Sequence, residues 1–403
     1  MLLGPYRRVL SVPGGAAFSA AGFVARLPIS MQTLGTVLLV AATSGSYALA
    51  GAVSASFALA LAVFSPVLGR LVDRLGQARV LIATLAVHTV GVGALVALAL
   101  ADAPAWTLFP AAAVYGGSYS QPGSLVRARW SHVLGDTSLL PTAFSWESVI
   151  DEVIFVVGPV LVTVLATGVA PAAGLLAAYG FTVVGSIALA LQRQTEPPAH
   201  PAVGGAGRRR SALTLPGMPV LVAVAVALGS IFGSIEVATV AFTAERGRPA
   251  AAGIVLALLA AGSLVAGLWY GTVRWRAPLP RRFVLGVLLL AAVTVPLPLA
   301  PGVAALAVLA FVGGFAISPA LIAGFALLDR LVPAPSRTEG LAWFSTGIGI
   351  GLALSSSVTG QVVDAAGGGA ALVVTVASGL LAAVLALGGA RRLADHRPRG
   401  DDI

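Results

Sequence analysis

Residues 79–100 read R-V-L-I-A-T-L-A-V-H-T-V-G-V-G-A-L-V-A-L-A-L, with no charged side chain after Arg79. A helix needs roughly 20 mainly apolar residues to cross about 30 Å of hydrocarbon. Because lipid offers the backbone no hydrogen bonds, such a stretch must satisfy its own backbone groups as a helix. Residues 79–100 are therefore predicted to span a membrane.

Stretches of the same kind recur along all 403 residues. About twelve satisfy the length rule for a spanning helix. The ninth is the weakest, because Pro296, Pro298 and Pro301 shorten it. The predicted spans are 14–40, 47–69, 79–100, 106–128, 141–166, 171–192, 216–242, 250–272, 283–299, 303–328, 339–361 and 370–390.

The composition supports a membrane protein. Hydrophobic residues make up 58% of the chain and charged residues only 10%, and the mean hydropathy is +0.97. A soluble domain carries about 25% charged residues. There is no cysteine, which excludes disulfides and thiolate metal sites, and the four histidines show no metal-binding spacing. No cofactor is expected.

The distribution of arginines predicts the orientation, since cytoplasmic loops collect positive charge. With the N-terminus in the cytoplasm, every arginine falls on the cytoplasmic side except Arg246, Arg248 and the intramembrane Arg26. This partition requires an even number of spans. The net charge of +9 is thus explained without nucleic acid, and both termini of this multi-pass protein are expected in the cytoplasm.

Residues 193–215 are rich in Pro, Gly and Arg and show no apolar period, which predicts a cytoplasmic linker. The linker separates an N-terminal six-helix bundle, 1–192, from a C-terminal one, 216–390, and 391–403 would form a cytoplasmic tail. The halves share a pattern at one offset, which indicates an internal repeat. Gly116, Gly117, Pro122 and Trp146 correspond to Gly313, Gly314, Pro319 and Trp343.

A charged motif follows the second predicted span: G-R-L-V-D-R-L-G-Q-A-R, residues 69–79. It resembles the signature of the major facilitator superfamily, G-x-L-x-D-R-x-G-R-[RK], and lies at the position where that family carries it. Gln77 replaces a usual basic residue. The matching residues are Gly69, Leu71, Asp73, Arg74, Gly76 and Arg79.

The resemblance covers essentially the whole chain and implies an all-α membrane protein with 12 transmembrane helices in two pseudo-symmetric six-helix bundles. Asp73 can accept hydrogen bonds from a helix N-terminus or an arginine, so the motif is expected to act as a conformational latch. The alternative is an ordinary charged turn. The predicted latch consists of Gly69, Asp73, Arg74, Gly76 and Arg79.

Gly158 and Pro159 lie in the fifth predicted span, in V-V-G-P-V-L-V. Proton-driven drug antiporters of the resembled family carry a longer G-P-x-x-G-G motif there, and the second Gly pair is missing here. The pair therefore gives modest support to drug and sugar efflux. The alternative is a simple proline kink.

Ionisable side chains within a membrane are costly and are candidates for function. Arg26 lies about 18 Å along the first span and Asp151 about 15 Å along the fifth, at about 1.5 Å per residue. Because these two helices are neighbours in the resembled fold, we predict an ion pair of Arg26 with Asp151 or Glu152.

Glu147 and Asp151 share one face of the fifth span, and Glu152 is turned about 100° away. Three carboxylates cannot all ionise freely in low dielectric, so one of them is predicted to carry a coupling proton. The alternative is a static network joining the first, fourth and fifth helices, in which Arg127 or Arg129 neutralises Glu147. For Glu147 the static network is favoured.

Glu236, in the seventh span, is predicted to be a second proton or substrate site, or to pair with Arg246 or Arg248. Trp106, Trp130, Trp269 and Trp275 fall near predicted interfaces, as expected for an aromatic belt.

The sequence lacks the Gly-rich phosphate loop of ATP-driven pumps and any nucleophile motif, so no enzyme is predicted. The predicted function is proton-coupled efflux of a small organic molecule across the cytoplasmic (inner) membrane by alternating access, by a protein that works as a monomer. The first alternative is an organic-anion or sugar transporter or facilitator with Arg26 as substrate ligand. A remote alternative is a non-transporting receptor or membrane enzyme.

Overall fold

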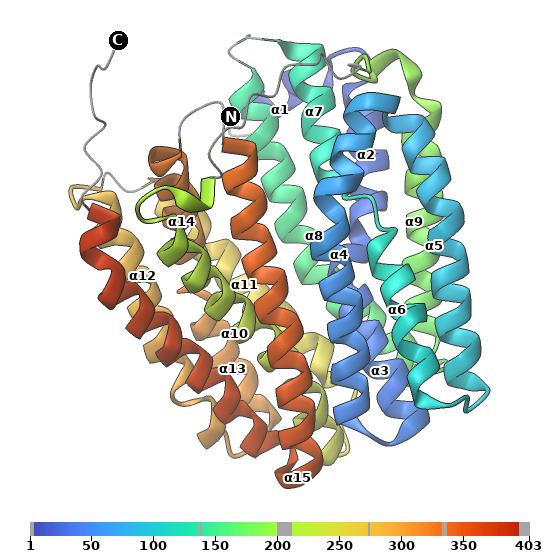
Figure 1. The fold of residues 1–403 in the computed structure, drawn as a ribbon, viewed down its shortest axis with the longest axis vertical. Helices are drawn as coiled ribbons and strands as arrows, with labels where there is room; N and C mark the ends of the chain where they lie inside the picture. Colours follow the sequence, from blue (N-terminus) through green and yellow to red (C-terminus); the bar gives the residue numbers. More distant parts are fainter. Residues whose placement is uncertain are drawn as a thin grey trace. The chain divides into compact units, whose positions relative to one another are not determined.

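A computed structural model describes residues 4–135, 137, 139–199, 212–272, 275–332 and 337–394. These residues are almost entirely helical and include no strand (Figure 1). They form two compact units, the first comprising 1–205 and 249–257, the second 206–248 and 258–403. The all-α fold and its two helical bundles agree with the prediction.

The first unit contains nine α-helices among its described residues up to 199, together with three 3-10 turns. The helices α1, α2 and α3 are followed by two long helices, α4 and α5, then by the shorter α6 and α7, and finally by α8 and α9. Their bounds are α1 Gly4–Leu10, α2 Gly15–Arg26, η1 Leu27–Ser30, α3 Gln32–Ser44, α4 Tyr47–Leu75, α5 Gln77–Leu100, η2 Ala105–Thr107, α6 Leu108–Gly117, α7 Pro122–Leu134, α8 Leu140–Gly168, α9 Ala173–Leu191 and η3 Arg193–Thr195.

The second unit follows the predicted linker, of which residues 200–211 lie outside the described residues. Its longest helix, α15, includes the beginning of the predicted tail at Arg391, while 395–403 are again outside. The bounds are η4 Ala212–Thr214, α10 Met218–Glu245, α11 Ala251–Thr272, α12 Leu279–Thr294, η5 Leu297–Leu299, α13 Val303–Gly314, α14 Ile317–Leu331 and α15 Arg337–Ala394.

Ten described segments are long and apolar enough to cross a membrane. The prediction of twelve spans differs from this number for two reasons. The last two predicted spans form one continuous assignment, α15, which bends at Gly367, whose φ of 86° lies in the left-handed region that favours glycine. The fourth predicted span, 106–128, corresponds to two consecutive helices, α6 and α7, neither of which is long enough by itself to count among the ten.

The break of the fourth span follows from its sequence. Gly116 and Gly117 have low helix propensity, and Pro122 disfavours helical backbone at Gln121 while suiting the first position of a new helix. Gln121 accordingly has an extended backbone, with ψ 94°. The tenth span is also interrupted, between Gly314 and Ile317. Both interruptions occur at the repeated Gly-Gly pairs.

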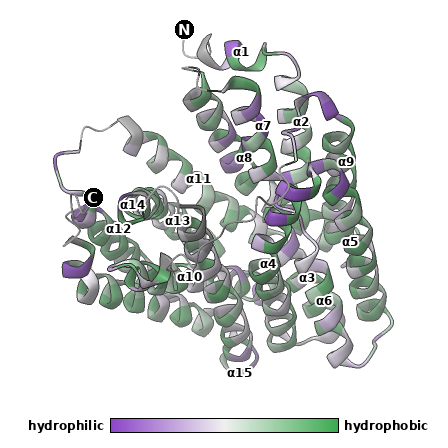
Figure 2. Ribbon diagram, turned by 45° about the horizontal axis from the view of Figure 1, so that its top comes forward, coloured by the Kyte–Doolittle hydropathy of each residue, from purple (hydrophilic) through white to green (hydrophobic). Residues whose placement is uncertain are grey.

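Each unit has its own apolar core. In the first, Phe18 and Trp130 pack edge to face with ring centroids 4.4 Å apart. In the second, α10 packs along α15, and Phe283 and Phe344 are fully buried. Hydrophobic residues dominate the helices of both units, whereas hydrophilic residues colour parts of α7 and α8 (Figure 2). Three charged side chains of the first unit, those of Arg26, Arg129 and Glu147, are buried and need explanation.

Candidate functional site

Arg26 is the last residue of α2, where Pro28 in the following turn ends the α-helix. The Arg26 side chain is only 2% exposed. Its Nε donates a hydrogen bond to the carbonyl of Gly22, 3.1 Å away, one turn earlier in the same helix. This bond leaves both terminal nitrogens of the guanidinium directed to other partners.

Both of those nitrogens bind carboxylates of α8. Nη1 donates to Oδ1 of Asp151 at 2.9 Å, and Nη2 forms an ion pair with Oε2 of Glu147. The predicted pair of Arg26 with Asp151 is confirmed. Glu152, the other predicted partner, forms no ion pair among the described residues.

Glu147 is completely buried, with 0% exposure, and all of its partners are hydrogen-bond donors. Oε1 accepts from the hydroxyl of Ser19 at 2.8 Å and from the indole N–H of Trp130 at 2.7 Å, while Oε2 binds Arg26. The prediction that Arg127 or Arg129 neutralises Glu147 is therefore wrong. Three donors, one of them charged, hold this carboxylate in place.

Arg127, on α7, binds the other oxygen of Asp151, with Nη2 2.6 Å from Oδ2. Asp151 thus bridges two guanidiniums. The side chains of Asp151 and Arg127 are 33% and 35% exposed, in contrast to those of Arg26 and Glu147. Glu147, Arg26, Asp151 and Arg127 are hereafter the ionic cluster, which connects α2, α7 and α8 within the first unit.

Arg129 lies outside the ionic cluster although it is fully buried. Its Nε donates to Oε1 of Gln77 at 2.7 Å, and its terminal nitrogens bind the carbonyls of Leu189 and Gln192 at the end of α9. Gln77 in turn donates to the carbonyl of Leu125 at 3.1 Å. Gln77, which replaces a usual basic residue in the motif, therefore links α5 to α7.

The predicted latch motif is mostly helical. Gly69 lies inside α4, which continues past the predicted end of the second span to Leu75. Gly76 alone turns the chain, with φ 87°, and a Cβ there would lie 2.9 Å from Oε1 of Glu196. Asp73, Arg74 and Arg79 are exposed.

Gly158 and Pro159 lie inside α8. A Cβ at Gly158 would lie 1.9 Å from Oγ of Ser30, whose hydroxyl donates to the carbonyl of Ile154 at 2.8 Å. Glycine at 158 therefore permits the close approach of η1 to α8. This packing holds the segment that follows Arg26 against the helix that carries its partners.

Glu236 lies on α10 and is half-buried. Arg246, one of its two predicted partners, lies over the ring of Phe242 and forms its ion pair with Glu245 at 3.7 Å. Glu245 also accepts a hydrogen bond from the backbone N–H of Gly368, 2.5 Å away, at the bend of α15. Glu245 thus links the end of α10 to the bend of α15.

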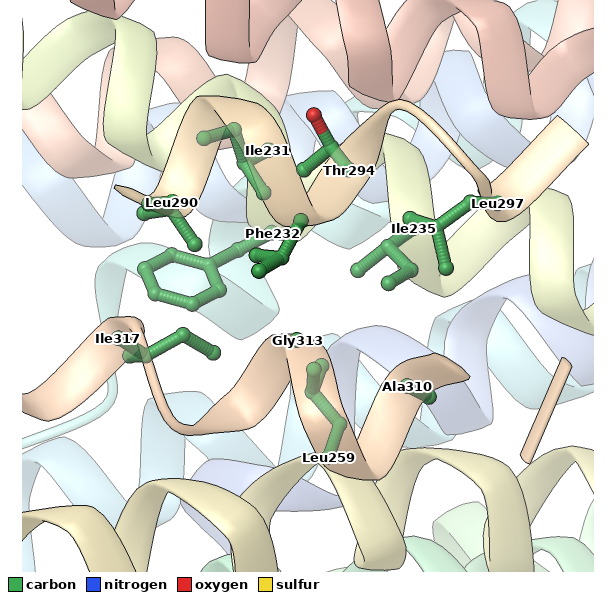
Figure 3. Close-up of a pocket in the computed structure, with 11 residues that line it drawn as sticks. Ile231, Phe232, Ile235, Leu259, Leu290, Thr294, Leu297, Ala310, Gly313 and Ile317 are labelled. Atoms are coloured by element: carbon green, nitrogen blue, oxygen red, sulfur yellow. The ribbon is translucent and has the colours of Figure 1, made fainter. Parts of the chain in front are cut away.

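The interior of the second unit also contains an apolar cavity of about 20 Å³ (Figure 3). A cavity of that size accommodates about one water molecule, which needs at least two polar partners. The hydroxyl of Thr294 already donates to the carbonyl of Ala291, at 2.7 Å. The other lining residues are apolar: Ile231, Phe232, Ile235, Leu259, Leu290, Val293, Leu297, Ala310, Gly313 and Ile317.

Ser19 and Trp130 are site residues that the sequence analysis missed. Trp130 was predicted to lie in an aromatic belt, yet it is completely buried, whereas Trp106 and Trp269 are 71% and 57% exposed. Helical spacing carried a signal for both, since Ser19 lies two turns before Arg26 and Trp130 one turn after Arg127. Within the described residues, no group of three or more His, Asp or Glu could hold a metal.

Comparison with known proteins places this site in a family. The model of the Major Facilitator Superfamily matches residues 16–301. A search of curated protein sequences finds no match.

Solved structures with a similar fold are transporters. The nucleoside transporter NupG (D323A mutant) has a TM-score of 0.71 at 18% identity, and the match covers 94% of this chain and 99% of that one. An auto-inhibited POT family peptide transporter has a TM-score of 0.71 at 14% identity, covering 95% and 97%. A bacterial homologue of the iron transporter ferroportin has a TM-score of 0.70 at 16% identity, covering 93% and 98%.

Proposed function

The chain belongs to the Major Facilitator Superfamily, and we propose that it is a secondary transporter that couples proton movement to the efflux of a small organic molecule. The observation that supports this most is the ionic cluster, because buried charges in a membrane are costly and are retained where they act. We place it in the cytoplasmic membrane as a monomer with both termini in the cytoplasm.

In the proposed mechanism Asp151 carries the coupling proton. It is the cluster carboxylate that is partly exposed, so a proton from water can reach it while Glu147 stays fixed. Protonation removes the negative charge that holds Arg26 and Arg127 together and so changes the preferred conformation in alternating access. Glu152, half-buried one residue further along α8, is the second candidate carrier, and we assign Glu236 a secondary role.

The motif residues Asp73, Arg74 and Arg79 are proposed to act as the latch, with Gly76 providing the turn. Their exposure leaves them available to bind another part of the chain in a different conformation. We propose no catalytic activity.

A second candidate function is organic-anion transport with Arg26 as a substrate ligand. The convergence of two arginines on one partly exposed carboxylate favours it over sugar transport, since a neutral sugar needs no pair of cations.

Reconstitution in liposomes with an interior pH dye tests the proposal. A pH gradient is imposed, and lipophilic cations, sugars and organic anions are added in turn to the wild type, Asp151→Asn and Glu152→Gln. We expect one class to move protons in the wild type, and Asp151→Asn to lower that proton flux by about tenfold or more, as expected for loss of an essential proton carrier. Solute equilibration without proton movement for every class would show a facilitator and contradict the coupling.

A further inference from the structure

The two carboxylates of the ionic cluster differ in how easily a solute could take their place. Glu147 has 0% exposure, and donors from Ser19, Trp130 and Arg26 occupy both of its oxygens. Asp151 receives only guanidinium N–H groups and is 33% exposed. A solute can therefore compete with Asp151 for Arg26 Nη1 and Arg127 Nη2, whereas the two oxygens of Glu147 stay occupied by their buried donors.

The two guanidiniums around Asp151 form a clamp for one carboxylate. Each carboxylate oxygen accepts from a different arginine, at 2.9 Å from Arg26 and 2.6 Å from Arg127. Arginine is suited to planar recognition of this kind. Gly123 leaves the clamp unobstructed, because a Cβ there would lie 3.2 Å from Cδ of Arg26 and 3.4 Å from Nη1 of Arg127.

The charges of the cluster balance as they stand, with Arg26 and Arg127 against Glu147 and Asp151. A bound anion adds one negative charge, which is costly at a mostly buried site. A proton on Asp151 removes that excess and frees Nη1 of Arg26 and Nη2 of Arg127, while Arg26 stays bound to Glu147.

The neighbouring titratable groups do not replace Asp151 in this role. Glu152 on α8 has no ion-pair partner among the described residues, and the hydroxyl of Tyr119 donates to the carbonyl of Ala25 at 3.1 Å. On α1 the hydroxyl of Tyr6 hydrogen-bonds with that of Ser145 at 3.2 Å. None of these groups bridges the two arginines.

We propose that Asp151 occupies the place of a substrate carboxylate, and that an organic monoanion binds between Arg26 and Arg127 when Asp151 takes up a proton from water. The inference rests on the proposed function and names its substrate class. It adds Arg127 as a ligand and makes Asp151 a competitor of the substrate.

Calorimetric titration of the full chain in lipid nanodiscs tests this, with acetate, lactate and benzoate as probes and benzamide as the neutral control. We expect the wild type to bind a monocarboxylate more tightly at about pH 5 than at about pH 8, because carboxylates take up protons toward the lower value. Asp151→Asn, which removes the competing charge, should bind about tenfold more tightly than the wild type at the higher pH and lose the pH dependence.

Arg127→Gln should weaken binding by about tenfold or more through loss of a charge-assisted hydrogen bond. This variant should fold, because Asp151 keeps Arg26 as a partner. Arg8→Gln is the matched control and should bind like the wild type, since Arg8 is exposed on α1 and outside the cluster.

Two results would overturn the inference: binding of every probe that is unchanged by Arg127→Gln, or binding that Asp151→Asn does not strengthen at the higher pH. The liposome assay separates the two proposals. Proton-coupled movement of a cation or sugar, without binding of any monocarboxylate, refutes the anion site and leaves the transporter proposal standing. Absence of transport for all solute classes refutes the transporter proposal itself.

Discussion

The interiors of the two units differ although their sequences repeat the same Gly-Gly pattern. The first unit buries Arg26, Arg129 and Glu147, and Ser19 and Trp130 donate hydrogen bonds to Glu147. The second surrounds its cavity with apolar side chains and a threonine whose hydroxyl binds its own helix. A repeated backbone pattern therefore does not require repeated chemistry. Among the described residues, the ion pairs that involve a buried side chain lie in the first unit.

The largest expected effect of this difference concerns Glu147. Glu147→Gln removes the charge that pairs with fully buried Arg26, and breaking a buried pair costs about 3–5 kcal/mol. Glu245→Gln is the counterpart in the second unit, where the side chain is 41% exposed and accepts from the N–H of Gly368. Because glutamine keeps an oxygen that can accept this bond, the cost should not exceed the roughly 1 kcal/mol of a lost cap.

Circular dichroism of the purified proteins during thermal unfolding measures both changes. Equal shifts of the unfolding midpoint in the two variants would contradict the assignment of the buried charge to the first unit alone.

The second comparison uses the repeated glycines. A Cβ at Gly116 would lie 2.1 Å from the carbonyl oxygen of Phe57, so Gly116→Ala forces backbone apart and should cost about 1–3 kcal/mol or more. At Gly313, the repeat-related position, the nearest atom is Cδ1 of Leu259 at 3.9 Å. Gly313→Ala should be neutral or stabilising by up to about 1 kcal/mol, through helix propensity.

The same unfolding measurement applies to this pair. In the second unit the close approach has moved to Gly314, where a Cβ would lie 2.1 Å from the carbonyl oxygen of Leu259. Gly314→Ala therefore serves as the positive control, and a destabilised Gly313→Ala with an unaffected Gly314→Ala would show that the packing is misassigned.

The smallest expected difference is the one between substitutions of two buried serines. Ser19→Ala removes a hydrogen bond to the ionised Glu147, worth about 1.5–3 kcal/mol. Ser263→Ala removes a bond between neutral hydroxyls, with Ser318 at 2.8 Å, worth about 0.5–1.5 kcal/mol. Urea titration of unfolding resolves the two values, and a larger loss at Ser263 would mean that Glu147 does not depend on Ser19.

The spans and their two-bundle arrangement were predictable because hydrophobic length and arginine distribution are properties of single segments. The pairing of Arg26 with Asp151 was predictable from their depth along two helices expected to be neighbours. Depth does not specify rotation about the helix axis, however. The prediction therefore paired Glu147 with Arg127 or Arg129, whereas in the structure Glu147 pairs with Arg26.

Local breaks were predicted less well than lengths. The repeat was recognised from Gly116, Gly117 and Pro122, but no helix break was predicted within the span. The length of an apolar stretch does not by itself indicate where a helix is interrupted. Conversely, the second span was predicted to end at Gly69, where the motif begins, whereas α4 continues to Leu75. In both cases local backbone preferences decided the outcome.

Trp130 gives this protein an optical probe of its own. Its indole N–H donates a hydrogen bond to Glu147 and the side chain is completely buried, whereas Trp106 and Trp269 are largely exposed. Brominated lipids should therefore quench the emission of Trp106 and Trp269 and spare that of Trp130. In a variant that keeps Trp130 as its one tryptophan, the emission that survives such quenching would report from beside the ionic cluster, so changes in the cluster could be followed in a bilayer without attaching any dye.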